Sequence, residues 1–244
     1  MIRSPLLRLA ALTAFALSSF SAGSAAAAPA ASGPVLGLQT WTCRNMDFDQ
    51  VVAFAVKHGI THLQLIGKQE NRKLFEFAKL VGISVIIVEP KNQAEWDNLE
   101  QLVKEYDIRL AIHNHGTGST YGDPETVKKV LAARDRRIGV CLDVGWVTAA
   151  GFDAAKVFRE YGDRVFDMHL KDKVIQTAAD GKKTPVDTEI GKGSANYAGL
   201  FAEIKRSKWN GVMAIETDSK AFAEDPNRLV SEAKSFFAAS TARK

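Results

Sequence analysis

The chain has 244 residues, of which 46% are hydrophobic and 25% are charged, and its formal net charge at pH 7 is +4. Two of the basic residues, Arg3 and Arg8, lie at the start; without them 30 Lys and Arg stand against 28 Asp and Glu, a net charge of only +2. Nucleic-acid binding needs a basic patch or stripe and is therefore not expected.

The first 30 residues predict a signal peptide. Arg3 and Arg8 are followed by an apolar stretch over Leu9–Phe20 and by small residues over Ser24–Ala30 with several A-x-A sequences, which is the order found in export signals. The apolar stretch is shorter than the roughly 20 residues of a membrane span. We expect a periplasmic or secreted protein made of residues 31–244, with no membrane contact after cleavage.

From Pro34 onward, apolar runs alternate with amphipathic stretches, which predicts parallel strands joined by helices. The runs are nearly continuously apolar, as in strands that are covered on both faces: Val35–Trp41, Thr61–Ile66, Ile83–Glu89, Arg109–His115, Ile138–Val144, Arg164–Leu170 and Gly211–Glu216. Helices are expected over Phe48–His58, Arg72–Val81, Gln93–Tyr106, Pro124–Ala133, Ala154–Tyr161, Tyr197–Ser207 and Asn227–Ala239.

These elements predict one α/β domain, a TIM (β/α) barrel with seven recognisable strands. About 215 residues follow the leader, which suits one large domain better than two. The segment Lys171–Ala195, rich in Lys, Asp, Gly and Thr, is expected to be a loop over one end of the barrel. Cys43 and Cys141 lack metal or redox spacing; pairing in an oxidising compartment and two buried thiols are both open.

Five consecutive runs end in a side chain that can bind a metal ion. Barrel active sites lie at the carboxyl ends of the strands, so we expect these side chains to meet there. Burying like charges at one mouth is costly unless a cation compensates them. The mixed nitrogen and oxygen donors favour one divalent ion, Mn²⁺, Zn²⁺, Co²⁺ or Fe²⁺, over Ca²⁺. The residues are Glu89, His113 with the nearby His115, Asp143, His169 and Glu216.

Several segments resemble the xylose-isomerase-like sugar phosphate isomerase/epimerase superfamily: Gly37–Trp41, Ala111–His115, Arg137–Gly145, Met168–Asp172 and Gly211–Glu216. The resemblance runs from about Leu36 to Ala239 and implies a TIM barrel. Members of that superfamily hold a divalent metal with Glu, Asp, His and Glu from four strands. The resemblance therefore implies His113, Asp143, His169 and Glu216 as the metal ligands, with His113 in place of the first glutamate.

The same resemblance implies an isomerase or epimerase that removes a proton next to a carbonyl of a (keto-)sugar or cyclitol. Glu216, His115 or His113 would act as the base, and Lys171 would contact a substrate oxygen. With a histidine at position 113, this segment resembles that of lyase-type members, including inosose dehydratases and enzymes acting on 3-keto-sugars. A lyase or hydratase is therefore the alternative.

The segment between Ile66 and Asn71 departs from the superfamily, whose members usually have a helix, a strand and another helix there. The barrel is therefore expected to be incomplete on that side. A non-catalytic periplasmic sugar-binding protein on a degenerate barrel is the alternative from another functional class. The apurinic endonucleases of this fold need three metals and a basic DNA face, which this chain does not offer. The substrate, the metal and the oligomeric state stay open.

Overall fold

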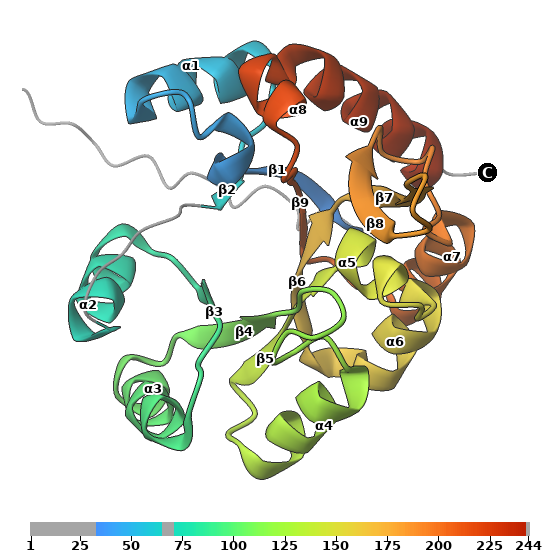
Figure 1. Ribbon diagram of the computed structural model, residues 1–244. Coiled ribbons are helices and arrows are strands. Elements are labelled where there is room, and N and C mark those ends of the chain that lie inside the picture. The colour runs from blue at the N-terminus through green and yellow to red at the C-terminus, as the bar shows by residue number, and fades with distance from the viewer. Residues whose placement is uncertain (1–32, 65–70, 243–244) are drawn as a thin grey trace, which may run out of the picture. The chain divides into compact units, whose positions relative to one another are not determined.

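Seven parallel strands form one curled sheet in the computed structural model, which describes residues 33–64 and 71–242. Residues 31–244 make up one compact unit. The strand order is β2-β1-β9-β6-β5-β4-β3, and Figure 1 shows how the sheet curls into part of a barrel. The strands are β1 (Val35–Gln39), β2 (Leu63–Gln64), β3 (Val85–Val88), β4 (Arg109–His113), β5 (Ile138–Asp143), β6 (Val165–Leu170) and β9 (Val212–Ile215).

The two ends of this sheet, β2 and β3, are not paired with each other among the described residues. Residues 65–70, which join the two sides, lie outside the described part of the chain. The prediction of an incomplete TIM barrel with seven strands is confirmed. The register aligns the neighbouring strand ends, since Asp143 on β5 pairs with His169 on β6 and His113 on β4 pairs with Cys141 on β5.

Helices connect the strands and lie around the outside of the curl (Figure 1). Side-chain caps fix several of their starts, as at Asp123, whose carboxylate accepts from the Glu125 backbone N–H while Pro124 begins the helix. The long helices agree with the predicted ones to within two residues. They are α1 (Phe48–Lys57), α2 (Asn71–Val81), α3 (Gln93–Tyr106), α4 (Pro124–Ala133), α6 (Ala154–Tyr161), α7 (Tyr197–Ser207) and α9 (Pro226–Thr241).

The expected loop over Lys171–Ala195 is the main error in the predicted elements. It contains an antiparallel hairpin, β7 (Asp172–Thr177) and β8 (Lys183–Thr188). Its strands are largely polar and mostly exposed or half-buried, so they lack the apolar pattern that marks a strand. Four short elements were also not predicted: the 3₁₀ turns η1 (Thr40–Cys43) and η2 (Gly162–Arg164), and the helices α5 (Val144–Ala149) and α8 (Lys220–Glu224).

The apolar core includes Cys43, whereas Cys141 lies on the same face of β5 as Asp143. Cys43 and Cys141 are free and buried, so the interpretation as two buried thiols is correct and the disulfide is not formed. No helix within the described residues combines the length and the hydrophobicity that crossing a bilayer requires. The predicted signal peptide, residues 1–30, lies outside the described residues.

Candidate metal centre

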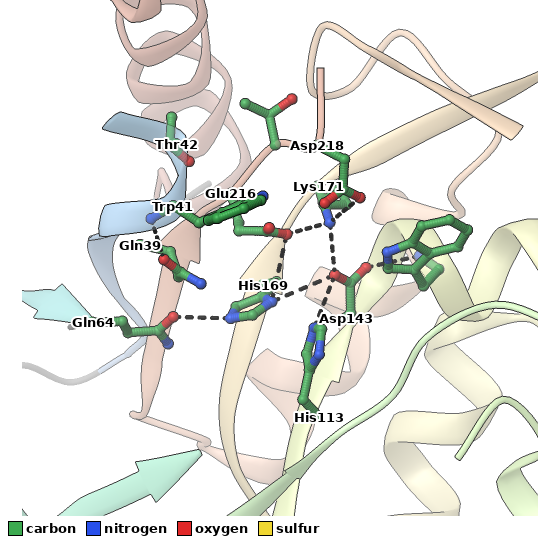
Figure 2. A network of polar contacts seen from close by, with 12 residues as sticks. Gln39, Trp41, Thr42, Gln64, His113, Asp143, His169, Lys171, Glu216 and Asp218 are labelled. Carbon is green, nitrogen blue, oxygen red and sulfur yellow. Dashed lines mark hydrogen bonds and ion pairs between the residues drawn. The ribbon is translucent and has the colours of Figure 1, made fainter. Parts of the chain in front are cut away.

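The strand ends place a cluster of charged side chains inside one mouth of the curled sheet. His113 ends β4, Asp143 ends β5, His169 lies one residue before the end of β6, and Glu216 directly follows β9. All four side chains are buried. The structure thus brings together the four residues that the sequence singled out, as Figure 2 shows.

Asp143 is at the centre of the cluster, and its two carboxylate oxygens have separate partners. Oδ1 accepts a 2.7 Å hydrogen bond from the Trp146 backbone N–H and caps α5. Oδ2 lies 3.4 Å from His113 Nε2 and 3.4 Å from His169 Nδ1. The Asn114 side chain bonds both the N–H and the carbonyl of Asp143. The carboxylate is therefore held with one oxygen directed at the two imidazoles.

His113 is oriented from its other side by Glu89. The Nδ1 atom of His113 lies 2.9 Å from Glu89 Oε1. An ionised carboxylate only accepts hydrogen bonds, so Nδ1 carries a proton there, and Nε2 is the ring nitrogen that faces Asp143. A carboxylate behind a histidine in this way is the usual support of a metal-binding imidazole.

His169 has the same arrangement with an amide in place of the carboxylate. Its Nε2 atom lies 2.9 Å from Gln64 Oε1, and its Nδ1 atom is buried without a hydrogen-bond partner. Nδ1 is also 3.6 Å from Glu216 Oε2. A buried polar atom without a partner is uncommon in a folded protein, so Nδ1 is oriented towards a ligand position rather than towards a bond within the chain.

Lys171 supplies the positive charge of the cluster. Its side chain is 1% exposed, and Nζ lies 3.3 Å from Asp143 Oδ2 and 2.8 Å from Asp218 Oδ2, with a close ion pair to Glu216 Oε2. Gly145 makes room for it, since a Cβ there would lie 2.7 Å from Lys171 Cγ. The ion pair between Lys171 and Glu216 is close but is not aligned as a hydrogen bond. Glu216 Oε2 is therefore buried without a hydrogen-bond partner.

The ionisation of these groups follows from burial opposed by their partners. Burial favours the neutral forms: it lowers the pKa of His169 to about 4 and raises that of Glu216 to about 7. For Asp143, burial is outweighed by the Lys171 ammonium and by the two neighbouring imidazoles, so its pKa lies well below the usual range. His113 is likewise buried, yet Asp143 and Glu89 raise its pKa to about 9.

These donors fit a divalent metal ion. A tetrahedral ion with bonds of about 2.0–2.2 Å separates its ligand atoms by about 3.3–3.6 Å. The separations within the cluster are 3.4 Å from Asp143 Oδ2 to each imidazole nitrogen and 3.6 Å from His169 Nδ1 to Glu216 Oε2. The donor atoms of His113, Asp143 and His169 all lie within 4.8 Å of one another, a group that does not include Glu216. Metal binding needs the inward nitrogen of each imidazole unprotonated, so His113 would lose a proton when the ion binds.

His115 lies beside this cluster rather than within it. Its side chain is 38% exposed and its Nδ1 atom lies 3.2 Å from Glu89 Oε2, while its ring centroid is 4.4 Å from that of His113. Glu89, His113 and His115 form a second group of possible metal donors. That group needs the Nδ1 atom of His113, which already donates to Glu89, so the Asp143 cluster is the better site.

A groove lies beside His115. It has a volume of about 560 Å³ and runs between the segment after β4, helix α5 and the hairpin. Thr117, Trp146, Ile175 and Pro185 are among the residues that line it with His115. The hairpin that sequence patterns did not reveal thus forms one wall of this groove.

Several site residues were missed by sequence reasoning. Gln64 lies at the end of its strand like the other site residues. It is uncharged, however, and so lacks the feature that marks the others in the sequence. Asp218 lies two residues after Glu216 and binds Lys171 and Lys173. Lys173 and Asp187 form an ion pair at the base of the hairpin, with side chains only 3% exposed; nothing in the local pattern marks them as buried.

Comparisons with known proteins agree with this architecture. The sequence model of the family described as "Xylose isomerase-like TIM barrel" matches residues 47–239. Inosose dehydratase of Clostridium perfringens is 24% identical over 163 residues, which are 59% of this chain and 54% of that protein. Inosose dehydratase of Lacticaseibacillus casei is 24% identical over 161 residues, 58% of this chain and 53% of that protein. The chain spans about half the length of these curated relatives.

Solved structures show the same fold at lower identity. The structure described as "IOLI protein with a binding zinc atom" matches with a TM-score of 0.64 at 12% identity, over 84% of this chain and 97% of that one. A sugar phosphate isomerase/epimerase from Parabacteroides distasonis matches with a TM-score of 0.59 at 16% identity, over 88% and 98%. Identities this low establish a shared fold and nothing finer.

Proposed function

Because the chain belongs to the xylose isomerase-like TIM barrel family, we propose that it is a divalent-metal-dependent sugar isomerase or epimerase. Its substrate is a (keto-)sugar or cyclitol from which it removes a proton next to a carbonyl. The observation that carries this proposal is the Asp143 cluster, in which two inward imidazole nitrogens face a carboxylate oxygen at metal-ligand spacing. The names of the relatives, inosose dehydratases and a sugar phosphate isomerase/epimerase, support this substrate class.

In this proposal His113, Asp143, His169 and Glu216 hold the ion. When bound, such an ion acts as a Lewis acid that polarises a substrate oxygen and stabilises negative charge formed on proton loss. The zinc atom of the IOLI structure supports a metal of this kind. Mn²⁺, Zn²⁺, Co²⁺ and Fe²⁺ all suit the mixed donor set.

His115 is our first candidate for the group that handles the substrate proton. Its Nδ1 atom is engaged by Glu89, which leaves Nε2 for a substrate in the groove, and a positioned imidazole is the most frequent general base or acid. Glu216 is the second candidate, because its buried carboxylate lies next to the same mouth. Lys171, held by Asp218, would donate a hydrogen bond to a substrate oxygen.

A lyase is the second candidate function, and the names of the curated relatives favour it, since all those compared are inosose dehydratases. A lyase and an isomerase share the first step, removal of the proton, and differ in the second. The isomerase returns a proton to the substrate, whereas the lyase expels a leaving group from the neighbouring carbon.

Incubation of the zinc-loaded protein with inososes and keto-sugars in D₂O separates these functions. Deuterium at the carbon next to the carbonyl, in a product of unchanged formula, is the result expected for an isomerase or epimerase. Loss of water from the substrate identifies the lyase. Calorimetric binding without exchange or turnover would contradict both and indicate a sugar-binding protein. Asp143→Ala is the control for exchange without an intact cluster.

A further inference from the structure

Gln64 reaches across the interior of the curled sheet. It belongs to β2, an edge strand of two residues, and β1 and β9 separate β2 from β6 in the sheet order. Its side chain nevertheless makes two hydrogen bonds to residues of β6, one to His169 and one to Asp167. Figure 2 shows the Gln64 amide directed at the far side of the His169 ring from Asp143.

The two bonds use the two ends of the amide. Gln64 Oε1 lies 2.9 Å from His169 Nε2, and Gln64 Nε2 donates to Asp167 Oδ1 at 2.5 Å. Asp167 and His169 are two residues apart on β6 and so point to the same face of the strand. Their side chains are buried, with residue exposures of 7% and 2%. The bonds are thus sheltered from water, where each polar group needs a partner within the chain.

We propose that Asp167 and Gln64 are positioning residues that fix the tautomer of His169. The carboxylate of Asp167 accepts from the Met168 backbone N–H and from Gln64 with the same oxygen. This interaction sets the amide so that its oxygen faces His169. An amide oxygen only accepts, so the proton of the neutral imidazole is on Nε2 and the lone pair is on Nδ1, towards Asp143 and Glu216.

The opposite tautomer would need a rotated amide. His169 would then carry its proton on Nδ1 and donate it to Asp143, while Gln64 would turn its NH₂ group to Nε2. When Asp167 is ionised, that rotation places the amide oxygen against its carboxylate, two acceptors without a proton between them. The unfavourable contact disfavours the tautomer that closes the Nδ1 position to a ligand. Gln64 therefore acts on His169 as Glu89 acts on His113.

The test compares Gln64→Met, which keeps the length of the side chain but removes the amide, with Asp167→Asn. The asparagine introduced at position 167 can place its amide oxygen where Asp167 Oδ1 accepts from the Met168 N–H and from Gln64, so the orientation of the Gln64 amide is kept. Gln39→Met is the matched control, because Gln39 ends the neighbouring strand β1 and its side chain caps η1 through the Trp41 N–H. Nitrogen NMR of the metal-free proteins reports which imidazole nitrogen of His169 carries the proton, and calorimetric titration reports Zn²⁺ affinity.

We expect Gln64→Met to lose the Nε2–H tautomer and to weaken Zn²⁺ binding by about 10- to 100-fold, the usual effect of removing a group that orients a metal ligand. Asp167→Asn and Gln39→Met should resemble the wild type in both measurements. A wild-type tautomer and affinity in Gln64→Met would overturn the inference. The Zn²⁺ titration rests on the proposed metal site, whereas the NMR measurement of the His169 tautomer does not. If the wild-type protein binds no Zn²⁺, the proposed function is contradicted, and the NMR comparison still decides the role of Gln64.

Discussion

At the scale of single residues, the cluster depends on Asp143 more than on any other proposed ligand, because its Oδ2 atom faces both histidines and Lys171. We expect Asp143→Ala and His169→Ala each to abolish tight binding of one Zn²⁺ per chain. Glu89→Gln should have a smaller effect, since the new amide oxygen can still accept from His113 Nδ1. Metal content after dialysis checks this, and full occupancy in the two alanine variants would show that the ligands are wrongly assigned.

The two histidines of the β4 segment should separate metal binding from catalysis. His113→Ala should lower Zn²⁺ affinity at least about tenfold, the loss associated even with a supporting residue. His113→Glu should retain binding, because a carboxylate donor replaces the imidazole. His115→Ala should leave affinity unchanged and reduce turnover by about 10²–10⁴, the usual contribution of a general acid or base. Zinc titration of the three variants decides the roles: normal affinity in His113→Ala with loss in His115→Ala would reverse them.

Lys171 and a metal ion are expected to compete for the same carboxylates. The Lys171 ammonium contacts both Asp143 and Glu216, and removing one partner of a buried ion pair costs about 3–5 kcal/mol. Lys171→Met should therefore destabilise the metal-free protein but bind Zn²⁺ more tightly than the wild type. Unfolding with and without Zn²⁺ measures both effects. A variant that is less stable and also binds Zn²⁺ more weakly would show that Lys171 organises the ligands instead of competing.

At the scale of elements, the hairpin β7–β8 is fastened to the cluster through Asp187. Its Oδ2 atom accepts from the Thr217 hydroxyl and from the backbone N–H groups of Asp218 and Ser219, and its Oδ1 atom pairs with Lys173. Asp187→Ala leaves these donors without a partner, which costs about 1–3 kcal/mol. We expect faster hydrogen exchange in β7, β8 and residues 217–219. Gln176→Ala, at an exposed position of β7, is the control and should leave these rates unchanged.

At the scale of the whole molecule, we propose that the chain is exported and processed. The small residues after the apolar stretch are where a signal peptidase cuts, so the mature protein should begin within Ala26–Ser32. N-terminal sequencing of protein recovered from the periplasm or the medium checks this. Recovery of Met1 from that material would contradict the predicted cleavage.

The sequence by itself determined the strands, the long helices and the titratable side chains that meet at the strand ends. These features are local: an apolar run predicts a buried strand, and a charged residue at its end lies at the mouth of the barrel wherever the strand sits. Several helices even have the predicted bounds in the structure, among them Pro124–Ala133, Ala154–Tyr161 and Tyr197–Ser207. Seven runs, together with the short segment after Ile66, also sufficed for an incomplete barrel.

Only the tertiary structure decided which groups face one another across the barrel. Gln64 meets His169 over a separation of 105 residues, and that contact exists because the curl of the sheet brings β2 opposite β6. The hairpin was hidden for a related reason: its polar strands carry no apolar periodicity, and buried ion pairs such as Lys173 with Asp187 fasten it to the mouth. Whether a lysine is solvated or, like Lys171, buried among carboxylates depends on neighbours from distant segments, which a local pattern does not contain.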